Sequence, residues 1–318
     1  MNTPMIKAVR VHRYGGPEEL KLEQISRPNP LAGEVLIRIY AAGILPYDWK
    51  YRQGRFESIR PAKFPYIPGS SFAGIIEEVG ADVTEFRKGE AVFGRSDNGT
   101  YAEYTTAAAK GLFLKPEGLT FDEAVTIPGS ALPAWLTLFH DSGLKPGQKV
   151  LIHAAAGGFG TFAAQFAKWK GAYVIGTCST NNVELVHTLG ANHVIDYTSE
   201  RFEQSVSDVD LVIDTVGGNT LERSWSVVRQ GGILLSIVEE LSLEKAKARG
   251  VNVIKPGINS MPSPEELQEI SQQIAQMIVE GQIESVINKK FPLHAVQQAH
   301  ELSQTGHGRG RIVLQIAD

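Results

Sequence analysis

The sequence predicts an α/β protein with two domains, one a β-rich, barrel-like domain and the other a doubly wound parallel sheet covered by helices. Two observations lead to this prediction. In the first third of the chain, short alternating apolar segments are separated by glycine and proline turns. After Phe121, helical patterns alternate with short, unbroken apolar runs, which are typical of strands buried on both faces of a parallel sheet. A chain of 318 residues is long enough for two such domains.

The predicted strands of the first domain alternate apolar and polar side chains. Glu34–Tyr40 shows this most clearly, because Val35, Ile37 and Ile39 share one face. Turn-forming sequences such as Asp97-Asn98-Gly99 separate the strands. The other strands predicted in this part are Lys7–Val11, Gly74–Val79, Ala91–Gly94 and Tyr101–Thr106.

The second domain is predicted from a series of apolar runs. An amphipathic helix at Pro264–Gly281 follows it, and the apolar run Ile312–Ile316 would return to the first domain. We therefore predict a second domain at residues 124–264, inserted into a first domain formed by residues 1–123 and 265–318. Its predicted strands are Val150–His153, Tyr173–Thr177, Leu211–Asp214 and Ile233–Val238.

Composition argues against several classes of protein. The formal net charge is -4, so no basic excess favours binding to nucleic acid or to an anionic membrane. Cys178 is the single cysteine, which excludes an intrachain disulfide and a zinc site built from several thiolates. No apolar signal core opens the chain and no apolar run approaches about 18 residues, so we expect a cytoplasmic protein with no membrane segment.

A glycine-rich turn follows the apolar run Val150–His153 and leads into a helical pattern that ends near Trp169. A diphosphate bound at a helix N-terminus must approach backbone N–H groups, and inward-pointing Cβ atoms would block it. This strand–turn–helix context favours a dinucleotide site over a purely structural turn, which remains the alternative. The predicted diphosphate-binding residues are Ala156, Gly157, Gly158, Phe159 and Gly160.

The end of the next predicted strand bears on which dinucleotide binds. A carboxylate there would hold the adenosine ribose of NAD, but Gly176–Asn182 contains no acid. The hydroxyl groups of Ser179 and Thr180 could instead receive a 2′-phosphate. This favours NADPH, with NADH possible. The alternative is that Ser179–Asn182 only caps the helix that follows.

Taken together, these motifs resemble the zinc-independent quinone oxidoreductase branch of the medium-chain dehydrogenase/reductase superfamily. The resemblance covers nearly the whole chain, and the order and spacing of its motifs make it specific. It implies a GroES-like catalytic domain, a Rossmann cofactor domain and a cleft between them. The motifs are Ala41–Gly43, Pro46–Lys50, Ile67–Gly69, Phe72–Gly74, Ala154–Gly160, Leu189–Ala191, Val194–Tyr197, Asp214–Gly218 and Gly308–Val313.

The resemblance also implies an activity and a set of cofactor contacts. The activity is the NADPH-dependent reduction of quinones or enones (α,β-unsaturated carbonyl compounds) by a homodimer. Beyond the glycine turn, the implied contacts are Ser179, Thr180 and Tyr197 for the adenosine phosphate, Thr215, Val216 and Gly217 near the nicotinamide ribose, Ser236, Ile237 and Val238 beside the nicotinamide, and Arg309 across the cleft.

Several positions depart from the pattern of this family. Asn181 and Asn182 stand where a phosphate-binding lysine or arginine is frequent. Leu45, Ser71 and Pro133 replace an asparagine, an acid and a threonine, respectively. These departures bear on the substrate class more than on the fold.

No metal site is predicted. Zinc-dependent relatives use a cysteine and a Gly-His-Glu turn, but the corresponding stretches here are Gly43–Pro46 and Gly69–Ser71. The eight histidines lack ligand spacing. We interpret His153, which opens the glycine turn, as a hydrogen-bonded histidine at a strand end.

A quinone or enone is already an electrophile, so the protein needs only to position it and to stabilise the developing oxyanion. The candidates for catalysis are Tyr47, Asp48 and Lys50, of which Tyr47 or Lys50 could donate a proton. The alternatives are that Asp48 only caps a helix and that Lys50 is solvated. Met261 is a candidate either for lining the substrate pocket or for ordinary core packing.

Two other functions remain open at this point. The chain could be a non-catalytic NAD(P)H-binding scaffold or sensor, because three family positions are altered. A metal-dependent alcohol dehydrogenase is the less favoured third alternative.

Overall fold

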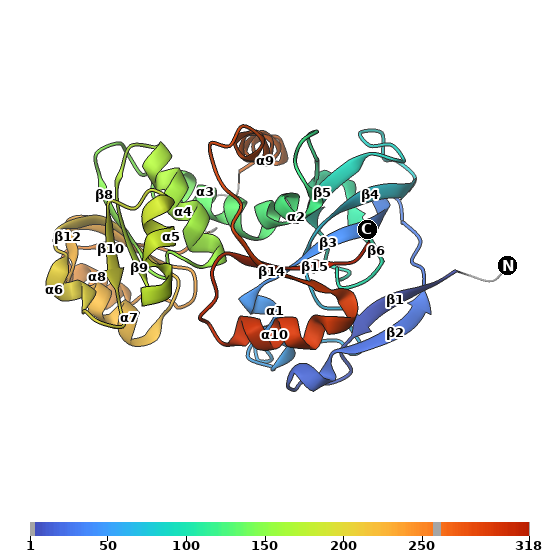
Figure 1. Cartoon of the computed structure of the whole chain (residues 1–318), viewed down its shortest axis with the longest axis horizontal. Coiled ribbons are helices and arrows are strands. Elements are labelled where there is room, and N and C mark those ends of the chain that lie inside the picture. The colour runs from blue at the N-terminus through green and yellow to red at the C-terminus, as the bar shows by residue number, and fades with distance from the viewer. Residues whose placement is uncertain (1–3, 257–261, 318) are drawn as a thin grey trace. The chain divides into compact units, whose positions relative to one another are not determined.

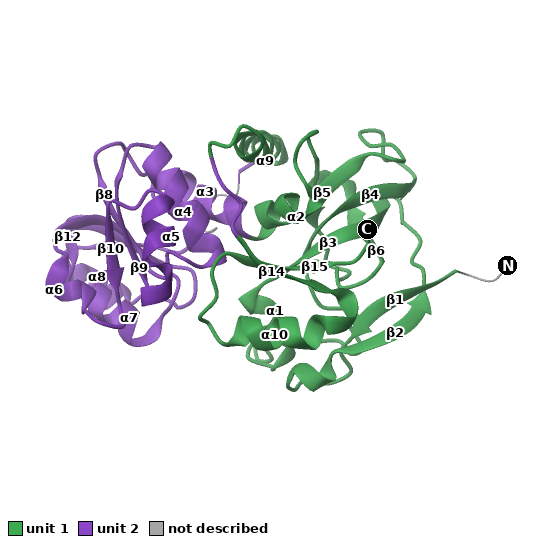
Figure 2. Ribbon diagram, viewed as in Figure 1, with its two compact units in different colours: residues 1–129, 264–282, 287–318 green, residues 130–263, 283–286 purple. Residues whose placement is uncertain are grey.

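The computed structural model describes residues 4–256 and 262–317, and the chain divides into two compact units (Figure 2). Unit 1 comprises Met1–Gly129, Pro264–Gln282 and Ile287–Asp318, and unit 2 comprises Ser130–Ser263 and Ile283–Val286. The sequence did not indicate that the last of these segments belongs to unit 2. Met261 lies outside the described residues.

Unit 1 is built on a seven-stranded sheet in the order β14-β15-β3-β4-β5-β7, with β6 paired to β3 (Figure 1). All its strand pairs are antiparallel except β14 with β15. A separate antiparallel pair is formed by β1 and β2. The strands are β1 (Met5–Arg10), β2 (Lys21–Ser26), β3 (Glu34–Ile44), β4 (Ser71–Val79), β5 (Ala91–Arg95), β6 (Tyr104–Ala108), β7 (Leu112–Leu114), β14 (Ile287–Pro292) and β15 (Arg311–Gln315).

The long strand β3 lies at the centre of this sheet. Val35, Ile37 and Ile39, which the alternating pattern placed on one face, are buried in one hydrophobic cluster. Strand β4 approaches β3 so closely that a Cβ on Gly74 would lie 2.2 Å from the carbonyl oxygen of Arg38. The β-rich domain is therefore confirmed.

Helices of unit 1 flank this sheet and carry several residues that are discussed below. They are α1 (Pro46–Arg52), α2 (Phe121–Ala124), α9 (Pro264–Val279) and α10 (Val296–Gln304), with short 3-10 turns η1 (Pro17–Glu19), η2 (Ala109–Gly111) and η6 (Leu293–Ala295).

Unit 2 contains a six-stranded, wholly parallel sheet in the order β10-β9-β8-β11-β12-β13 (Figure 1). The chain runs outward from β8 to β10 and then returns to continue outward from β11 to β13. This reversal between β8 and β11 is the point where doubly wound sheets bind ligands, so the predicted Rossmann architecture is confirmed. The strands are β8 (Lys149–Ile152), β9 (Tyr173–Cys178), β10 (His193–Asp196), β11 (Val209–Asp214), β12 (Val228–Ser236) and β13 (Asn252–Ile254).

Helices connect these strands, as parallel strands require. They are α4 (Gly158–Trp169), α5 (Val183–Thr188), α6 (Phe202–Ser205), α7 (Gly218–Ser224) and α8 (Leu243–Arg249), and α3 (Leu132–Trp135) precedes β8. Two stretches of wider helix, η3 (Ile127–Ala131) and η4 (Leu136–Asp141), adjoin α3, and the 3-10 turn η5 (Thr180–Asn182) precedes α5. No helix in the described part of the chain has the length and apolar character needed to span a membrane.

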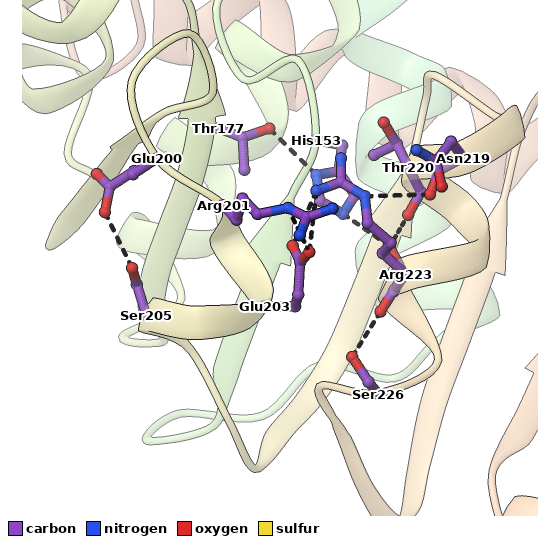
Figure 3. A network of polar contacts seen from close by, with 11 residues as sticks. His153, Thr177, Glu200, Arg201, Glu203, Ser205, Asn219, Thr220, Arg223 and Ser226 are labelled. Atoms are coloured by element: carbon purple, nitrogen blue, oxygen red, sulfur yellow. Dashed lines mark hydrogen bonds and ion pairs between the residues drawn. The ribbon is translucent and has the colours of Figure 1, made fainter.

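His153 is completely buried where β8 ends, and both of its ring nitrogens have partners (Figure 3). Nε2 lies 2.9 Å from the hydroxyl of Ser224, which itself donates to the carbonyl oxygen of Thr220. Nε2 must therefore carry the proton and donate to Ser224, while Nδ1 accepts from Thr177 at 3.1 Å. This histidine links β8, β9 and α7, which confirms that it is a hydrogen-bonded residue at a strand end.

The surroundings of His153 keep its ring neutral. Burial lowers its pKa to about 3, and the nearby Arg223 guanidinium acts in the same direction. Arg223 is paired with Glu203 at 2.9 Å (Figure 3). It also lies over the ring of Phe202, which packs against His153. The network is therefore built around an uncharged imidazole.

Replacement of His153 by glutamine tests whether the imidazole ring is neutral in the native protein. The unfolded chain protonates an ordinary histidine near pH 6.5, whereas the native protein keeps His153 neutral down to about pH 3. The stability gained from this residue is thus lost as pH falls below about 6.5. We expect the free-energy gap between wild type and His153→Gln in urea unfolding to shrink by about 1.4 kcal/mol per pH unit between about pH 6.5 and 4. A gap that is constant with pH would contradict a neutral, buried His153.

Candidate functional site

The turn between β8 and α4 presents bare main chain at the carboxyl edge of the unit 2 sheet. Gly157 occupies the N-cap position of α4 and offers no side-chain acceptor to the first helical amides. The helix continues for 12 residues, and its first turn contains no acidic side chain. These amides and the positive end of the helix therefore suit an anion.

Gly157 and Gly160 differ in what an added Cβ would contact. A Cβ on Gly160 would lie 2.4 Å from the carbonyl oxygen of Ala154 and 2.6 Å from Cα of Ala155, so helix and strand could not pack. A Cβ on Gly157 would meet only the carbonyl oxygen of Ala154, at 3.2 Å, and would otherwise enter open space. The turn thus leaves room beside its amides, and it fits the diphosphate of a dinucleotide.

A second part of the same edge is organised by Asp214, which is fully buried at the end of β11. Its carboxylate accepts hydrogen bonds from the amides of Val216 (3.1 Å) and Gly217 (3.0 Å) and from the hydroxyl of Ser236 (2.7 Å). Thr215 donates to the carbonyl oxygen of His153 at 2.8 Å. The loop after β11 is therefore tied to the ends of both β8 and β12.

Three apolar side chains at this edge remain exposed. Val216, Ile237 and Val238 are 52%, 40% and 38% exposed, although two of them directly follow a buried strand. Exposed apolar groups grouped beside a bare polar turn suit a ligand with a flat ring. Unit 2 thus brings the positions predicted for the nicotinamide and its ribose to the carboxyl ends of neighbouring strands.

The predicted adenosine-phosphate residues lie at the ends of β9 and β10. Thr180 does not present a free hydroxyl there, because it donates to the carboxylate of Asp196 at 2.7 Å. Tyr197 is 47% exposed, and its amide donates to the carbonyl oxygen of Cys178. Asp196 was not predicted, because this acid closes β10 and not β9, the strand whose end the dinucleotide pattern concerns.

Arg309 is exposed and belongs to unit 1, in the segment just before β15. All the other predicted cofactor contacts belong to unit 2. A role for Arg309 toward the cofactor therefore remains a prediction.

Unit 1 contains a pocket of about 770 Å³. The rings of Tyr47, Tyr51 and Tyr66 line it, together with the cationic side chains of Arg60 and Arg95. Tyr47 stacks on Tyr51 at 5.6 Å between ring centroids, and Arg60 donates to its hydroxyl at 3.4 Å. Of the predicted catalytic residues, this pocket brings together Tyr47 and Asp48.

Asp48 is almost completely buried and is held by two hydrogen bonds. Its carboxylate accepts from the amide of Leu45 at 2.8 Å, which caps α1, and from the hydroxyl of Tyr101 at 2.9 Å. Burial raises the pKa of Asp48 to about 6, although these bonds and the nearby Arg311 act in the opposite direction. The capping interpretation of Asp48 is thus confirmed, and a role in chemistry remains a prediction.

A chain of buried side chains continues from Asp48. Tyr101 donates to Asp48 and lies 3.3 Å from Nε2 of His300, while Nδ1 of His300 accepts from Arg52 at 3.1 Å. Because Arg52 can only donate, His300 must carry its proton on Nε2 and donate to Tyr101. Gln304 accepts from Arg52 as well, so the chain ties α1 to α10. The network was not predicted from the sequence, because Arg52 and His300 are 248 positions apart.

Lys50 has a different environment. Its ammonium lies 5.6 Å from the centroid of the Trp49 ring, and burial lowers its pKa. Among the described residues that line the pocket, α1 contributes Tyr47, Asp48 and Tyr51 but not Lys50. The geometry therefore favours Tyr47 over Lys50 as a group that contacts a ligand in this pocket. As for metals, the described residues contain no group of three or more histidine, cysteine, aspartate or glutamate side chains that could hold an ion.

Comparisons with known proteins agree with this architecture. Residues 31–117 match the family model described as alcohol dehydrogenase GroES-like domain, and residues 189–314 match the one described as zinc-binding dehydrogenase. The mouse quinone oxidoreductase is 32% identical over 326 residues, which cover 98% of each chain. A chloroplast envelope quinone oxidoreductase homolog of Arabidopsis thaliana is 30% identical over 98% of each chain.

Solved structures show the same relationship. The quinone oxidoreductase of Coxiella burnetii superposes with a TM-score of 0.90 at 30% identity, covering 99% of this chain and 100% of that one. The Escherichia coli quinone oxidoreductase complexed with NADPH has a TM-score of 0.91 at 28% identity, covering 97% of this chain and 99% of that one.

The Gly157→Ala variant tests the diphosphate turn. Gly157 has ordinary extended backbone angles, and an added Cβ would meet only the carbonyl oxygen of Ala154, at 3.2 Å, which a shift of a few tenths of an ångström would relieve, so we expect the variant to remain folded. The methyl group would occupy space that the diphosphate needs, so the Kd for a nicotinamide dinucleotide should rise about tenfold or more, measured by isothermal titration calorimetry. Gly111→Ala, where an added Cβ also meets open space, is the control and should bind normally. Unchanged binding by Gly157→Ala would contradict this site.

The Asp48→Asn variant tests the raised pKa of the buried carboxyl. The native protein takes up the Asp48 proton near pH 6, whereas an unfolded aspartate does so near 3.8, so this group costs stability as pH rises through that interval. Both hydrogen bonds go to the same oxygen of Asp48, so an asparagine whose amide oxygen takes that place could still accept from Leu45 and from Tyr101. We expect its stability relative to wild type to rise by up to about 3 kcal/mol from about pH 4 to 6 in chemical unfolding, and then to level off. The exposed Asp82→Asn controls for the chemical change. A gain that is independent of pH would contradict the prediction.

Proposed function

This chain belongs to the quinone oxidoreductase family, and we propose that it is a nicotinamide-dependent reductase of quinones that works without zinc. Enones are the second substrate class in this proposal, because they are electrophilic in the same way. The proposal that the reaction needs no zinc rests on the stretches Gly43–Pro46 and Gly69–Ser71, which offer neither a thiolate nor an imidazole.

The observation that carries the proposal is the uncapped start of α4. Its amides face a turn in which a Cβ on Gly157 would enter otherwise open space, at the carboxyl edge of a doubly wound sheet. A mere structural turn would not need this arrangement. The solved Escherichia coli relative is complexed with NADPH, which supports NADPH as the reductant, and NADH remains possible.

The residues of unit 2 would hold the dinucleotide, and a bound nicotinamide would supply the hydride. Amides at Gly158–Gly160 would bind the diphosphate. Asp214 fixes the Thr215–Gly217 loop and the end of β12, so that Val216, Ile237 and Val238 would contact the nicotinamide and its ribose. These side chains would exclude water from the flat face of the ring.

The pocket of unit 1 would receive the quinone. The rings of Tyr47, Tyr51 and Tyr66 suit a planar substrate. Because Arg60 donates to the oxygen of Tyr47, the phenolic proton of Tyr47 is free to be donated to the oxyanion that develops on the reduced quinone. Asp48 would act as a positioning residue, since it fixes the first turn of the helix that carries Tyr47.

Other parts of the prediction rest on the sequence alone. The homodimer follows from the family resemblance, and the cytoplasmic location is the expectation stated from the sequence. Both stay predictions.

The activity is tested by the oxidation of NADPH and of NADH in the presence of 1,4-benzoquinone, naphthoquinones, alkenals and simple ketones. We expect turnover with quinones and, more slowly, with enones. Loss of the Tyr47 hydroxyl in Tyr47→Phe should lower kcat about 100-fold with little change in the Kd of the dinucleotide. Tyr173→Phe, which removes an exposed hydroxyl from unit 2, should retain full activity.

Two outcomes would contradict the proposal at different points. Binding of a dinucleotide without oxidation by any acceptor would indicate a non-catalytic binding protein. Full activity of Tyr47→Phe would instead remove Tyr47 from the reaction and leave the reductase assignment intact.

A further inference from the structure

The pocket of unit 1 carries an excess of positive charge, in a chain whose formal net charge is -4. Its lining contains more cationic side chains than carboxyl groups. Net charge of one sign in a cleft raises the local concentration of ligands with the opposite sign. The cationic residues are Arg10, Arg60, Lys63 and Arg95, and the acids are Asp48 and Asp97.

Three of these cations have no carboxylate partner. Arg10 is paired with Glu23 at 3.2 Å, so its charge is already offset. Arg60, Lys63 and Arg95 are exposed, and the ion pairs within the described part of the chain include none of them. An anionic ligand would therefore not have to displace a carboxylate of the protein from these side chains.

The two acids of the pocket do not cancel this charge. Asp48 is almost completely buried and accepts hydrogen bonds from Leu45 and Tyr101. Burial raises its pKa to about 6, and the nearby Arg311 interacts favourably with the ionised form, which offsets its charge within the protein. Asp97 is exposed. One exposed carboxylate thus remains beside three exposed cations.

Arg95 is the most firmly placed of the three cations. It is the last residue of β5 and pairs with Ser71 of β4. The amide of Ser96, the next residue, donates to the carbonyl oxygen of Ser70 at 2.9 Å. The Arg95 guanidinium donates to the hydroxyl of Ser70 at 3.2 Å through one nitrogen. Its other N–H groups remain for a ligand, and a guanidinium fork matches the two oxygens of a carboxylate.

The same pocket also has an aromatic part, which includes the proposed proton donor. Arg60 donates to the hydroxyl of Tyr47 at 3.4 Å, and Tyr51 and Tyr66 line the pocket as well. Its volume of about 770 Å³ lies in the range of pockets that hold drug-sized ligands, which are larger than a bare quinone ring. A ring that packs on the tyrosines therefore leaves room for a substituent.

We propose that the substrates of this chain are quinones that carry an anionic substituent such as a carboxylate, which Arg95 and Lys63 bind. This inference rests on the proposed function and adds a substrate class to the same pocket. The quinone ring lies against the tyrosines, where Tyr47 donates its proton, and the substituent lies beside the cations. A neutral quinone uses only the aromatic part of the pocket.

A matched pair of ligands tests the proposal without turnover. The two compounds are 3-(1,4-naphthoquinon-2-yl)propanoate and its methyl ester, which share the ring and the saturated spacer and differ by one negative charge. Calorimetric titration of the full chain without any dinucleotide gives both Kd values. We expect the acid to bind about fivefold to tenfold more tightly than the ester, because single ion pairs at exposed sites are weak and two act here. Addition of about 0.3 M NaCl should shrink this preference by screening.

Variants of the cationic residues locate the effect. Arg95→Gln should reduce the preference for the acid to about twofold, and the double variant with Lys63→Gln should abolish it. Arg87→Gln is the matched control, because Arg87 is an exposed arginine of unit 1 outside the pocket lining. It changes the net charge as Arg95→Gln does and should keep the wild-type preference. A thermal melt of each variant verifies that the fold is retained.

The failure of this inference is distinguishable from the failure of the proposed function. Equal binding of acid and ester by wild type, or a preference that survives in the double variant, would overturn the substrate class and leave the reductase assignment intact. NADPH oxidation with the same two compounds tests the proposed function. If the acid binds with the expected preference but neither compound is reduced, the pocket binds anions without reducing them, and both the proposed function and this substrate class are wrong.

Discussion

The first amides of α4 have no side-chain cap, and the proposed dinucleotide site depends on these amides being available to a ligand. A helix N-terminus leaves backbone donors without partners, and most helices satisfy them with a serine, threonine or aspartate. Here Gly157 holds that position, and Gly160 lets the helix lie so close to β8 that any larger residue would strike Ala154. The site therefore consists of main-chain amides at the start of α4, and the neighbouring side chains hold these amides in position.

Buried polar side chains hold the candidate site residues in position in both units. In unit 2, the hydrogen bonds of His153, Thr215 and Asp214 tie the carboxyl ends of β8, β9, β11 and β12 together. In unit 1, the chain from Arg52 through His300 and Tyr101 to Asp48 fixes α1, which carries Tyr47 toward the pocket. Buried polar groups are costly unless satisfied, so each network permits few alternative arrangements.

The sequence predicted the regular parts of this molecule well, because alternation and unbroken apolar runs reflect burial directly. The strand Glu34–Tyr40 and the glycine turn are examples, since each depends on neighbours in the chain. The missed parts depend on residues that are distant in sequence. Arg52 and His300 are separated by 248 positions, and Thr180 meets Asp196 only because β9 and β10 pair in register. No local pattern indicates such partners.

The account depends most directly on a diphosphate bound to main-chain amides at the start of α4. The decisive measurement is a crystal structure of the protein grown with a nicotinamide dinucleotide. The account predicts diphosphate oxygens about 3 Å from the amides of Gly158–Gly160, with no side chain between them. A dinucleotide bound elsewhere, with this turn empty or filled by one of the protein's own side chains, would contradict it.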